Sequence, residues 1–353
     1  MGICLGSAEI KKAYLGYHPL KKIYLGGSRL WADETELVHV DSVARLSVGR
    51  YRLTAAAVGN YILFCGGRSN GAMSAAVDAY DISLTRTTPP PLSAARDRLA
   101  AASIGGYALI GGGNTGSASA VADAYDASLT RTTPTPLSVA RHKLAAASVG
   151  GCALFGGGSD GYATNAVDAY DASLTRTTPT PLSASRGFLA AASIGGYALF
   201  GGGNSSSGAV DAYDASLTRT TLTPLSVSRY ELAAAAVGGC ALFGGGYADS
   251  GNVNTVDAYD ASLTRITPTP LSVARSYFAA AAVGDCALFG GGDTGAGYTG
   301  AVDVYDTWLT RTSAAPLSAA RGFFAAAAAG DRALFGGGST GAYSNAADAY
   351  IVQ

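Results

Sequence analysis

Histidine, unbalanced charge and long apolar runs are all scarce in this chain, and each scarcity excludes a class of function. There are 3 histidines in 353 residues, and they lie in three unrelated sequence contexts: His18, His39 and His142. No cluster of His, Cys and Asp has the spacing of a metal site, so we predict neither a metal nor a cofactor. A net charge of −1 argues against nucleic acid as a partner. No apolar run is long enough to cross a bilayer, so membrane insertion is not expected.

The N-terminus lacks a signal-peptide pattern, because charged and polar residues interrupt any apolar core there. Cysteine is also sparse, with five residues, and three of them (Cys152, Cys240 and Cys286) occupy the same position of an internal repeat. Equivalent positions in different repeats would lie too far apart for a disulfide. We therefore expect free, buried thiols and synthesis in a reducing cytoplasm.

What the chain does contain is that repeat. The motif Ala-Leu-Phe-Gly-Gly-Gly recurs seven times with small variations, at intervals of 43–46 residues, and its first glycine position falls at Cys65, Gly111, Gly156, Gly201, Gly244, Gly290 and Gly336. This period suits one four-stranded blade of a β-propeller. In the copy from 144 to 186, Gly and Pro clusters separate four predicted strands, at 144–149, 152–155, 166–170 and 175–180. The first strand is nearly polyalanine, as expected where the innermost strands converge on the propeller axis.

The seventh copy stops at Tyr350, before a fourth strand. Upstream, the segment 45–50 matches 136–141 of a complete copy, so residues from about 36 to 46 should supply the missing strand. Pairing this N-terminal strand with the last blade would remove both exposed sheet edges. We therefore predict an all-β fold in which residues 36–353 form a seven-bladed propeller closed by an N-terminal strand.

These features resemble the kelch-repeat β-propellers of the galactose-oxidase/kelch-like superfamily. The resemblance covers residues 36–353 and rests on the diglycine after strand two, the Pro-Leu-Ser-x-x-Arg return, and one tyrosine per copy: Tyr80, Tyr125, Tyr170, Tyr213, Tyr259, Tyr305 and Tyr350. Thr132 and Thr177 stand where kelch repeats carry tryptophan, which indicates a divergent, bacterial-looking branch. The resemblance implies a binding protein, since most kelch propellers bind other molecules and a few are enzymes.

Residues 1–35 form a separate segment with a ten-residue repeat of its own: Cys4-Leu-Gly, Tyr14-Leu-Gly and Tyr24-Leu-Gly. Short strands joined by glycine-containing turns predict a small basic β-meander. Three strands of this length make a marginal domain, so we expect the segment to dock to the propeller or to a partner protein. The run Ile-Lys-Lys-x-Tyr-Leu-Gly at 10–16 resembles N-terminal segments of bacteriophage and prophage structural proteins, which implies docking to a virion.

The copies differ from one another in two places, the residue pair after each return arginine and the loop after the glycines. In an up-and-down blade both places emerge on one face of the disc, whereas the nearly invariant turns emerge on the other. The variable positions are rich in Tyr, Ser, Asn, Asp and Gly, a composition typical of adaptable recognition surfaces, although loops also drift neutrally. The candidate binding residues on this face are Tyr51, Asp97, His142, Tyr230, Tyr277, Tyr162, Tyr247, Tyr298 and Tyr343.

The return arginines are candidates of a different kind, because one is present in every blade. Converging guanidinium groups suit a carboxylate, sulfate or phosphate, and the kelch resemblance implies arginines at the axial pocket. Alternatively, each arginine pairs with a nearby carboxylate as part of the architecture. We include the whole ring in the candidate face: Arg50, Arg96, Arg141, Arg186, Arg229, Arg275 and Arg321. By contrast, we interpret Asp78, Asp123, Asp168, Arg86, Arg131 and Arg176 as an inter-blade polar ladder.

No catalytic residues emerge from the sequence. The Gly-Gly-Gly runs precede strands and lack a following Gly-Lys-Ser/Thr, and the Gly-x-Ser-x-Gly matches do not lie at a strand-to-helix turn. The leading hypothesis is a non-enzymatic recognition module, made in the bacterial cytoplasm and carried on a phage or prophage virion, that binds a host-surface glycan or protein. Two alternatives stay open: an intracellular bacterial scaffold that binds a protein partner, and a glycan-active enzyme in the central pocket.

Overall fold

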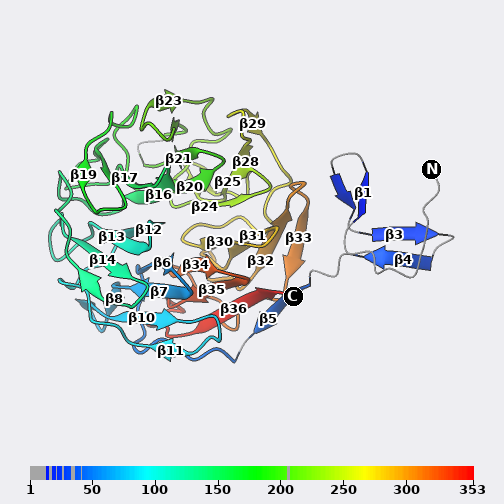
Figure 1. Cartoon of the computed structure of the whole chain (residues 1–353), viewed down its shortest axis with the longest axis horizontal. Helices are drawn as coiled ribbons and strands as arrows, with labels where there is room; N and C mark the ends of the chain where they lie inside the picture. Colours follow the sequence, from blue (N-terminus) through cyan, green and yellow to red (C-terminus); the bar gives the residue numbers. More distant parts are fainter. Residues whose placement is uncertain are drawn as a thin grey trace.

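Seven four-stranded antiparallel sheets stand around a common axis (Figure 1). The computed structural model describes residues 13–15, 18–20, 22–25, 28–32, 36–40, 42–204 and 207–353, which form β-strands, turns and loops. The predicted seven-bladed propeller is therefore confirmed. In these described ranges, no helix has the length and apolarity that a membrane span requires.

Each blade begins with its innermost strand and proceeds outward. Blade one contains β6 (Thr54–Val58), β7 (Tyr61–Cys65), β10 (Val77–Tyr80) and β11 (Arg86–Thr87). Blade two contains β12 (Ala100–Ile104), β13 (Tyr107–Gly111), β14 (Ala122–Asp126) and β15 (Arg131–Thr132). Blade three contains β16 (Ala145–Val149), β17 (Cys152–Gly156), β18 (Val167–Tyr170) and β19 (Arg176–Thr177). Blade four contains β20 (Ala190–Ile194), β21 (Tyr197–Gly201), β22 (Val210–Tyr213) and β23 (Arg219–Thr221).

The remaining blades follow the same order. Blade five contains β24 (Ala233–Val237), β25 (Cys240–Gly244), β28 (Val256–Tyr259) and β29 (Arg265–Ile266). Blade six contains β30 (Ala279–Val283), β31 (Cys286–Gly290), β32 (Val302–Asp306) and β33 (Arg311–Ala314). Blade seven contains β34 (Ala325–Ala329), β35 (Arg332–Gly336), β36 (Ala347–Val352) and β5 (Leu37–Val40). Small hairpins in two loops pair β8 (Arg68–Ser69) with β9 (Ala72–Met73), and β26 (Tyr247–Ala248) with β27 (Gly251–Asn252).

The N-terminal strand β5 closes the ring as the fourth strand of blade seven. It runs antiparallel to β36, with Val40 opposite Ala349 and Leu37 opposite Val352. The predicted closure is confirmed, and the pairing places a strand from the start of the propeller and its last strand in one sheet.

The two faces of the disc carry different connections. We call the face with the return loops and the loops between strands two and three the loop face, and the opposite face the turn face. Because Leu37 pairs with Val352 at the far end of β36, residue 36 and the C-terminal Gln353 both lie on the turn face, where their backbones bond at 3.0–3.1 Å. The chain therefore enters and leaves the propeller on the same side.

The described part of residues 1–35 forms two hairpins that share no ladder with a blade (Figure 1). Strand β1 (Ala13–Leu15) pairs with β2 (His18–Leu20), and β3 (Lys22–Leu25) pairs with β4 (Ser28–Ala32). This differs from the single meander that we expected. Only one residue separates β2 from β3, fewer than the two that a tight hairpin connection needs. The strand predicted at Cys4 lies outside the described residues.

The glycine that opens each Gly-Gly-Gly run lies against the next blade. A Cβ at Gly111 would come within 2.8 Å of the Phe155 ring, and one at Gly156 would come equally close to Phe200. The contact between blades one and two departs from this rule on both sides, because blade one has Cys65 where the others have glycine, and blade two has the smaller Ile110 where the others have phenylalanine. The two exceptions compensate each other, which explains why the motif tolerates a cysteine there.

Cys65, Cys152 and Cys240 are free cysteines, with Cys65 and Cys240 buried and Cys152 half-buried. Burial raises the pKa of the Cys65 thiol to about 12, so this thiol is inert near neutral pH. The prediction of free, buried thiols is confirmed for Cys240, whereas the free Cys152 is only half-buried; Cys4 lies outside the described residues.

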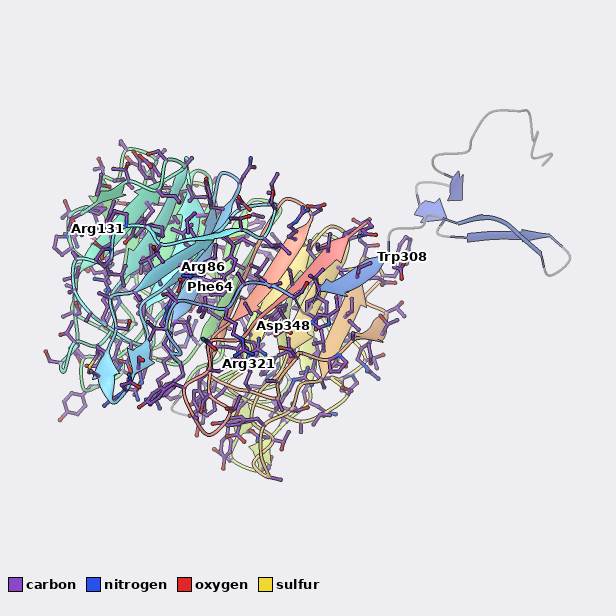
Figure 2. The ribbon with its side chains drawn as sticks, turned by 90° about the horizontal axis from the view of Figure 1, so that it is seen from below. Phe64, Arg86, Arg131, Trp308, Arg321 and Asp348 are labelled. Atoms are coloured by element: carbon purple, nitrogen blue, oxygen red, sulfur yellow. The ribbon has the colours of Figure 1, made fainter. Side chains whose placement is uncertain are left out.

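A fully buried Arg–Asp pair lies in every blade. The return arginine contacts the aspartate of strand three at 2.6–2.9 Å, and both side chains have no exposed surface. In blade three, Arg141 pairs with Asp168 and also donates to the Phe155 carbonyl at 2.9 Å. Figure 2 shows Arg321 and Asp348 of blade seven inside the ring. Because the arginine belongs to the loop arriving from the preceding blade, this pair attaches each blade to the previous one.

Two further groups bind the same aspartate. In blade three, Arg176 of strand four contacts Asp168 at 2.9 Å, and the backbone N–H of Ser138 donates to it at 2.9 Å. The pairing of Arg86, Arg131 and Arg176 with Asp78, Asp123 and Asp168 is therefore real, but each pair lies within one blade and not between blades.

Breaking one of these pairs should destabilise the whole ring. We expect Arg141→Ala to lower the free energy of unfolding by about 3–5 kcal/mol, because Asp168 is left buried without its main partner. The double variant Arg141→Met/Asp168→Leu should recover most of that loss. Chemical denaturation checks this, with the exposed Arg45→Ala as control. A loss below about 0.5 kcal/mol for Arg141→Ala would show that the pair is not what holds the blade.

Candidate ligand-binding site

A closed ring of seven backbone hydrogen bonds surrounds the axis on the loop face. One residue from each blade donates its N–H to the carbonyl of its counterpart in the preceding blade, with N···O distances of 2.7–3.2 Å. The residues are the second members of the variable pairs: Arg52, Arg98, Lys143, Phe188, Glu231, Tyr277 and Phe323. Their backbone polar groups are thus satisfied whatever side chain they carry.

All seven residues of this axial ring adopt the left-handed backbone conformation, with φ between 53° and 60°. None of them is glycine, and three are bulky aromatic residues, for which this conformation is unfavourable. Strain of this kind persists where the surrounding structure enforces it, and it is concentrated at functional sites. Here the hydrogen-bonded ring enforces it and directs seven side chains toward one point.

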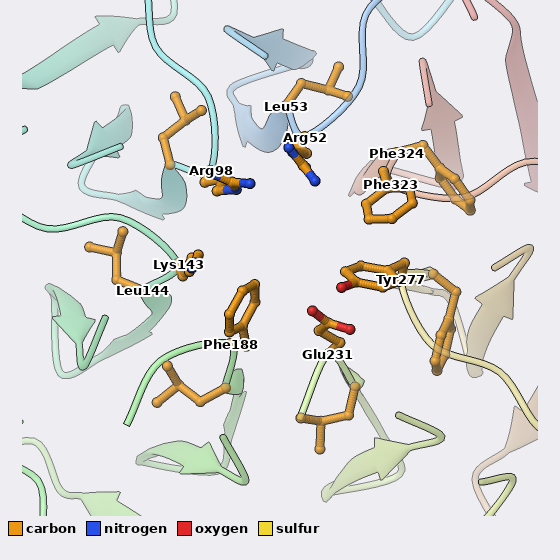
Figure 3. Close-up of a pocket in the computed structure, with 14 residues that line it drawn as sticks. Arg52, Leu53, Arg98, Lys143, Leu144, Phe188, Glu231, Tyr277, Phe323 and Phe324 are labelled. Carbon is orange, nitrogen blue, oxygen red and sulfur yellow. The ribbon is translucent and has the colours of Figure 1, made fainter. Parts of the chain in front are cut away.

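These side chains surround a cavity of about 390 Å³ (Figure 3). The next residue in each blade also lines the cavity, but Leu53, Leu144 and Phe324 point away from the axis, toward the space between blades. The chemistry at the centre is therefore set by the axial ring alone.

The axial ring is divided into two chemically different arcs. Arg52, Arg98 and Lys143 from blades one to three are consecutive and basic. The other arc contains Phe188, Glu231, Tyr277 and Phe323, with the rings of Tyr277 and Phe323 only 3.9 Å apart between centroids. The carboxylate of Glu231 and the hydroxyl of Tyr277 both point into the cavity (Figure 3). One side of the pocket can bind negative charge, and the other offers aromatic surface and hydrogen-bonding groups.

The carboxyl group of Glu231 is a weaker acid than a solvent-exposed glutamate. Burial raises its pKa to about 7, although a hydrogen bond from Tyr277 and the charges of Arg52 and Lys143 act in the opposite direction. The same burial raises the pKa of Tyr277. Near neutral pH the pocket therefore changes its net charge as Glu231 titrates.

The return arginines do not belong to this pocket, which corrects our assignment of them to the ligand-binding face. Each guanidinium is fully buried and paired with aspartate, because a charge removed from water needs a partner of opposite sign. Their architectural role is the one the structure shows. The residues concerned are Arg50, Arg96, Arg141, Arg186, Arg229, Arg275 and Arg321.

The other candidates are on the loop face, as predicted. Among the described residues, isolated β-bridges join the first member of six of the seven variable pairs to the loop of the same blade, for example Tyr51 to Arg68, His142 to Ser159 and Tyr230 to Tyr247. This pairing brings both variable places together around the pocket. Tyr277 lines the pocket itself.

The loop tyrosines form a rim outside the axial ring. Tyr162 is 87 % exposed, and Tyr247 and Tyr343 are each 40 % exposed. Tyr343 accepts a hydrogen bond from the Gly71 N–H at 2.8 Å, and Tyr298 donates to the Ser339 hydroxyl at 3.4 Å. Tyr51, His142, Tyr230 and Tyr298 are half-buried.

Asp97 is the exception among the selected face residues. Its side chain has no exposed surface, and both carboxylate oxygens lack a hydrogen-bond partner among the described residues. Asp97 therefore cannot contact a ligand on the surface. Its charge is felt by its neighbours, since it raises the pKa of Arg98, His142 and Lys143 against the larger effect of their own burial.

Our selection of candidates missed most of the axial ring. The variable pairs contained all seven residues, but we selected first members such as Tyr51 and Tyr230 and, of the second members, only Tyr277. The signal was present, because the second member runs basic, basic, basic, aromatic, acidic, aromatic, aromatic around the blades. No three His, Cys, Asp or Glu side chains in the described residues are arranged to hold a metal ion.

Comparison with known proteins decides the fold and leaves the function open. The solved structure of YjhT superposes with a TM-score of 0.60 at 13% sequence identity, covering 77% of this chain and 99% of that one. The chain is a β-propeller. No family model matches it, and no curated protein matches it, so its resemblance to kelch repeats stays a prediction. A total of 688 solved chains match this one, and a fold by itself does not indicate a ligand.

The left-handed conformation of the axial ring can be tested at Arg98. We expect Arg98→Gly to be more stable than Arg98→Ala by about 1 kcal/mol, because only glycine adopts φ near 53° without strain. Chemical denaturation of both variants measures the difference. Tyr51, whose φ is not positive, is the control, and there alanine should be the more stable of the two. The same order at both positions would contradict the strain.

Glu231 should make stability depend on pH. Its pKa is raised in the folded state, so its contribution is fully present below the unfolded pKa near 4.5 and is lost as the pH rises through about 7. Relative to the wild type, Glu231→Gln should therefore gain stability between pH 4 and pH 8. Thermal melts across this range check the direction, with the exposed Glu36→Gln as control. A difference between variant and wild type that is independent of pH would contradict the burial of Glu231.

Proposed function

We propose that this protein is a non-enzymatic recognition module that binds a glycan or protein on a cell surface through its loop face. The observation that carries the proposal is the axial ring, where the backbone repeats in every blade while the side chain changes from one blade to the next. Selection for architecture alone has no use for strained side chains of five different types around one cavity. Selection for a ligand does.

The aromatic rim supports a ligand larger than the cavity. Tyr230 and Tyr247 lie 5.6 Å apart between ring centroids, and Tyr51 lies 5.7 Å from Tyr343. These pairs surround the pocket on different blades and present flat, amphipathic surfaces. Tyrosine in such positions supplies contact area at low entropic cost, and it suits sugar rings as well as protein side chains.

The direction of the chain supports attachment to a larger assembly. Residue 36 lies on the turn face, so the segment 1–35 leaves the propeller on the side away from the pocket. A particle that held this segment would present the loop face outward. We propose a phage or prophage virion as that particle, with the protein made in the bacterial cytoplasm and the ligand on the host surface.

Binding of the labelled full-length protein to glycan arrays and intact bacterial cells tests the proposal. Tyr247→Ala should weaken binding at least fivefold, roughly the effect of losing 1 kcal/mol at an interface. The matched control is Trp308→Ala on the turn face, where the side chain is exposed to a similar extent, 44 % against 40 %. Figure 2 shows Trp308 at the margin of the ring.

Three outcomes separate the alternatives. Absence of binding both to glycan arrays and to intact cells would contradict recognition of a cell surface and favour a scaffold with a protein partner inside the cell. Equal weakening by both variants would mean that the loop face is not the binding surface. Turnover of a bound glycan that is lost in Glu231→Gln would reassign the protein as an enzyme.

A further inference from the structure

Three neighbouring cations in the axial pocket have no acidic partner among the residues that the structure describes. The seven return arginines each have an aspartate within 2.6–2.9 Å, which shows how this chain treats a buried positive charge. Arg52, Arg98 and Lys143 form no ion pair with any described residue. Arginines of the same molecule are thus paired at the return positions and unpaired, among the described residues, at Arg52 and Arg98.

The three cations also repel one another. After burial, which is the largest effect, the charge of Arg52 lowers the pKa of Arg98, and the charges of Arg98 and Arg52 lower the pKa of Lys143. Two acids raise the pKa of these cations: Asp97 acts on Arg98 and Lys143, and Glu231 acts on Lys143 from across the cavity. Neither acid forms an ion pair with Arg52, Arg98 or Lys143. Three positive charges this close together are electrostatically unfavourable, and a bound anion would relieve their repulsion.

Aromatic rings close both ends of the arc. The Lys143 ammonium lies 4.3 Å from the centroid of Phe188, and the Arg52 guanidinium lies 5.4 Å from that of Phe323 and 4.9 Å from that of Tyr51. Stacking of a guanidinium on a ring leaves its N–H donors free in their own plane. The side chains of Arg52, Arg98 and Lys143 donate no hydrogen bond to a described residue, so all three have donors available at the cavity.

We propose that Arg52, Arg98 and Lys143 form a binding site for one anionic group of the ligand, a carboxylate, sulfate or phosphate. Guanidinium groups bind such groups through paired, charge-assisted hydrogen bonds, and the ammonium adds a third positive charge. The rest of the ligand then faces Glu231 and Tyr277, so it is polar and not a hydrocarbon. This inference rests on the proposed function for its biological meaning, but the site is defined by the chain alone.

Titration of sulfate, phosphate and acetate into the full-length protein tests the site by calorimetry, at pH 7 and at constant ionic strength maintained with chloride. We expect saturable binding of at least one anion at one site per chain, and the preferred anion identifies the group. The double variant Arg98→Gln/Lys143→Gln should bind it at least about tenfold more weakly, because it loses two charged donors. Arg68→Gln is the matched control, since Arg68 lies on the same face outside the pocket.

The melting temperature of the double variant, measured without the anion, shows whether weaker anion binding is caused by unfolding. The double variant should melt no lower than the wild type, because the substitutions remove repulsion. Absence of saturable binding by all three anions overturns the site, as does binding that the double variant retains. Anion binding without any glycan or cell binding keeps the site and sinks the proposed function. Cell binding that is equally strong in the double variant supports the proposed function and contradicts the anion site.

Discussion

The buried Arg–Asp pair is the interaction on which the rest of this propeller depends. An ion pair removed from water is stabilised by further hydrogen bonds to its donors and acceptors. In blade three these come from the Phe155 carbonyl, the Ser138 N–H and Arg176, and in blade seven His39 of β5 takes the place of the second arginine. Because the arginine arrives on the loop from the preceding blade, satisfying the pair also sets how neighbouring blades stand. The motif that recurs around it from blade to blade includes the glycine whose N–H bonds to the arginine carbonyl, as Gly113 does with Arg141 at 2.9 Å.

This rigid base separates architecture from chemistry on the loop face. Directly above the buried pairs, the backbone ring satisfies its own polar groups and directs its side chains to the axis. No side chain of the axial ring has to hold the fold, so each is free to change. The result is seven independent positions on a fixed backbone, arranged as a basic arc facing an aromatic and acidic arc.

Sequence reasoning worked where the repeat constrains the chain and failed where a contact depends on one residue. The period and the missing final strand predicted seven blades and the closing strand β5, because a sheet edge must be paired. The return arginines were misassigned to the binding face, since a periodic arginine is equally compatible with a pocket and with a buried pair. Asp97 was misassigned for the same reason, because side-chain depth at one position does not follow from the repeat. The hairpins at 13–32 differ from a meander through the length of a single connection.

By itself the sequence determined the number of blades, the closure and the face on which variation gathers, because these follow from the period and from strand alternation. It also contained the compensation between Cys65 and Ile110, although only the contact between blades explains it. The tertiary structure decided which variable residue of each pair reaches the axis, and that the seven arginines are enclosed. The physical reason is that a left-handed residue in a hydrogen-bonded ring points its side chain in a direction that neither composition nor spacing encodes.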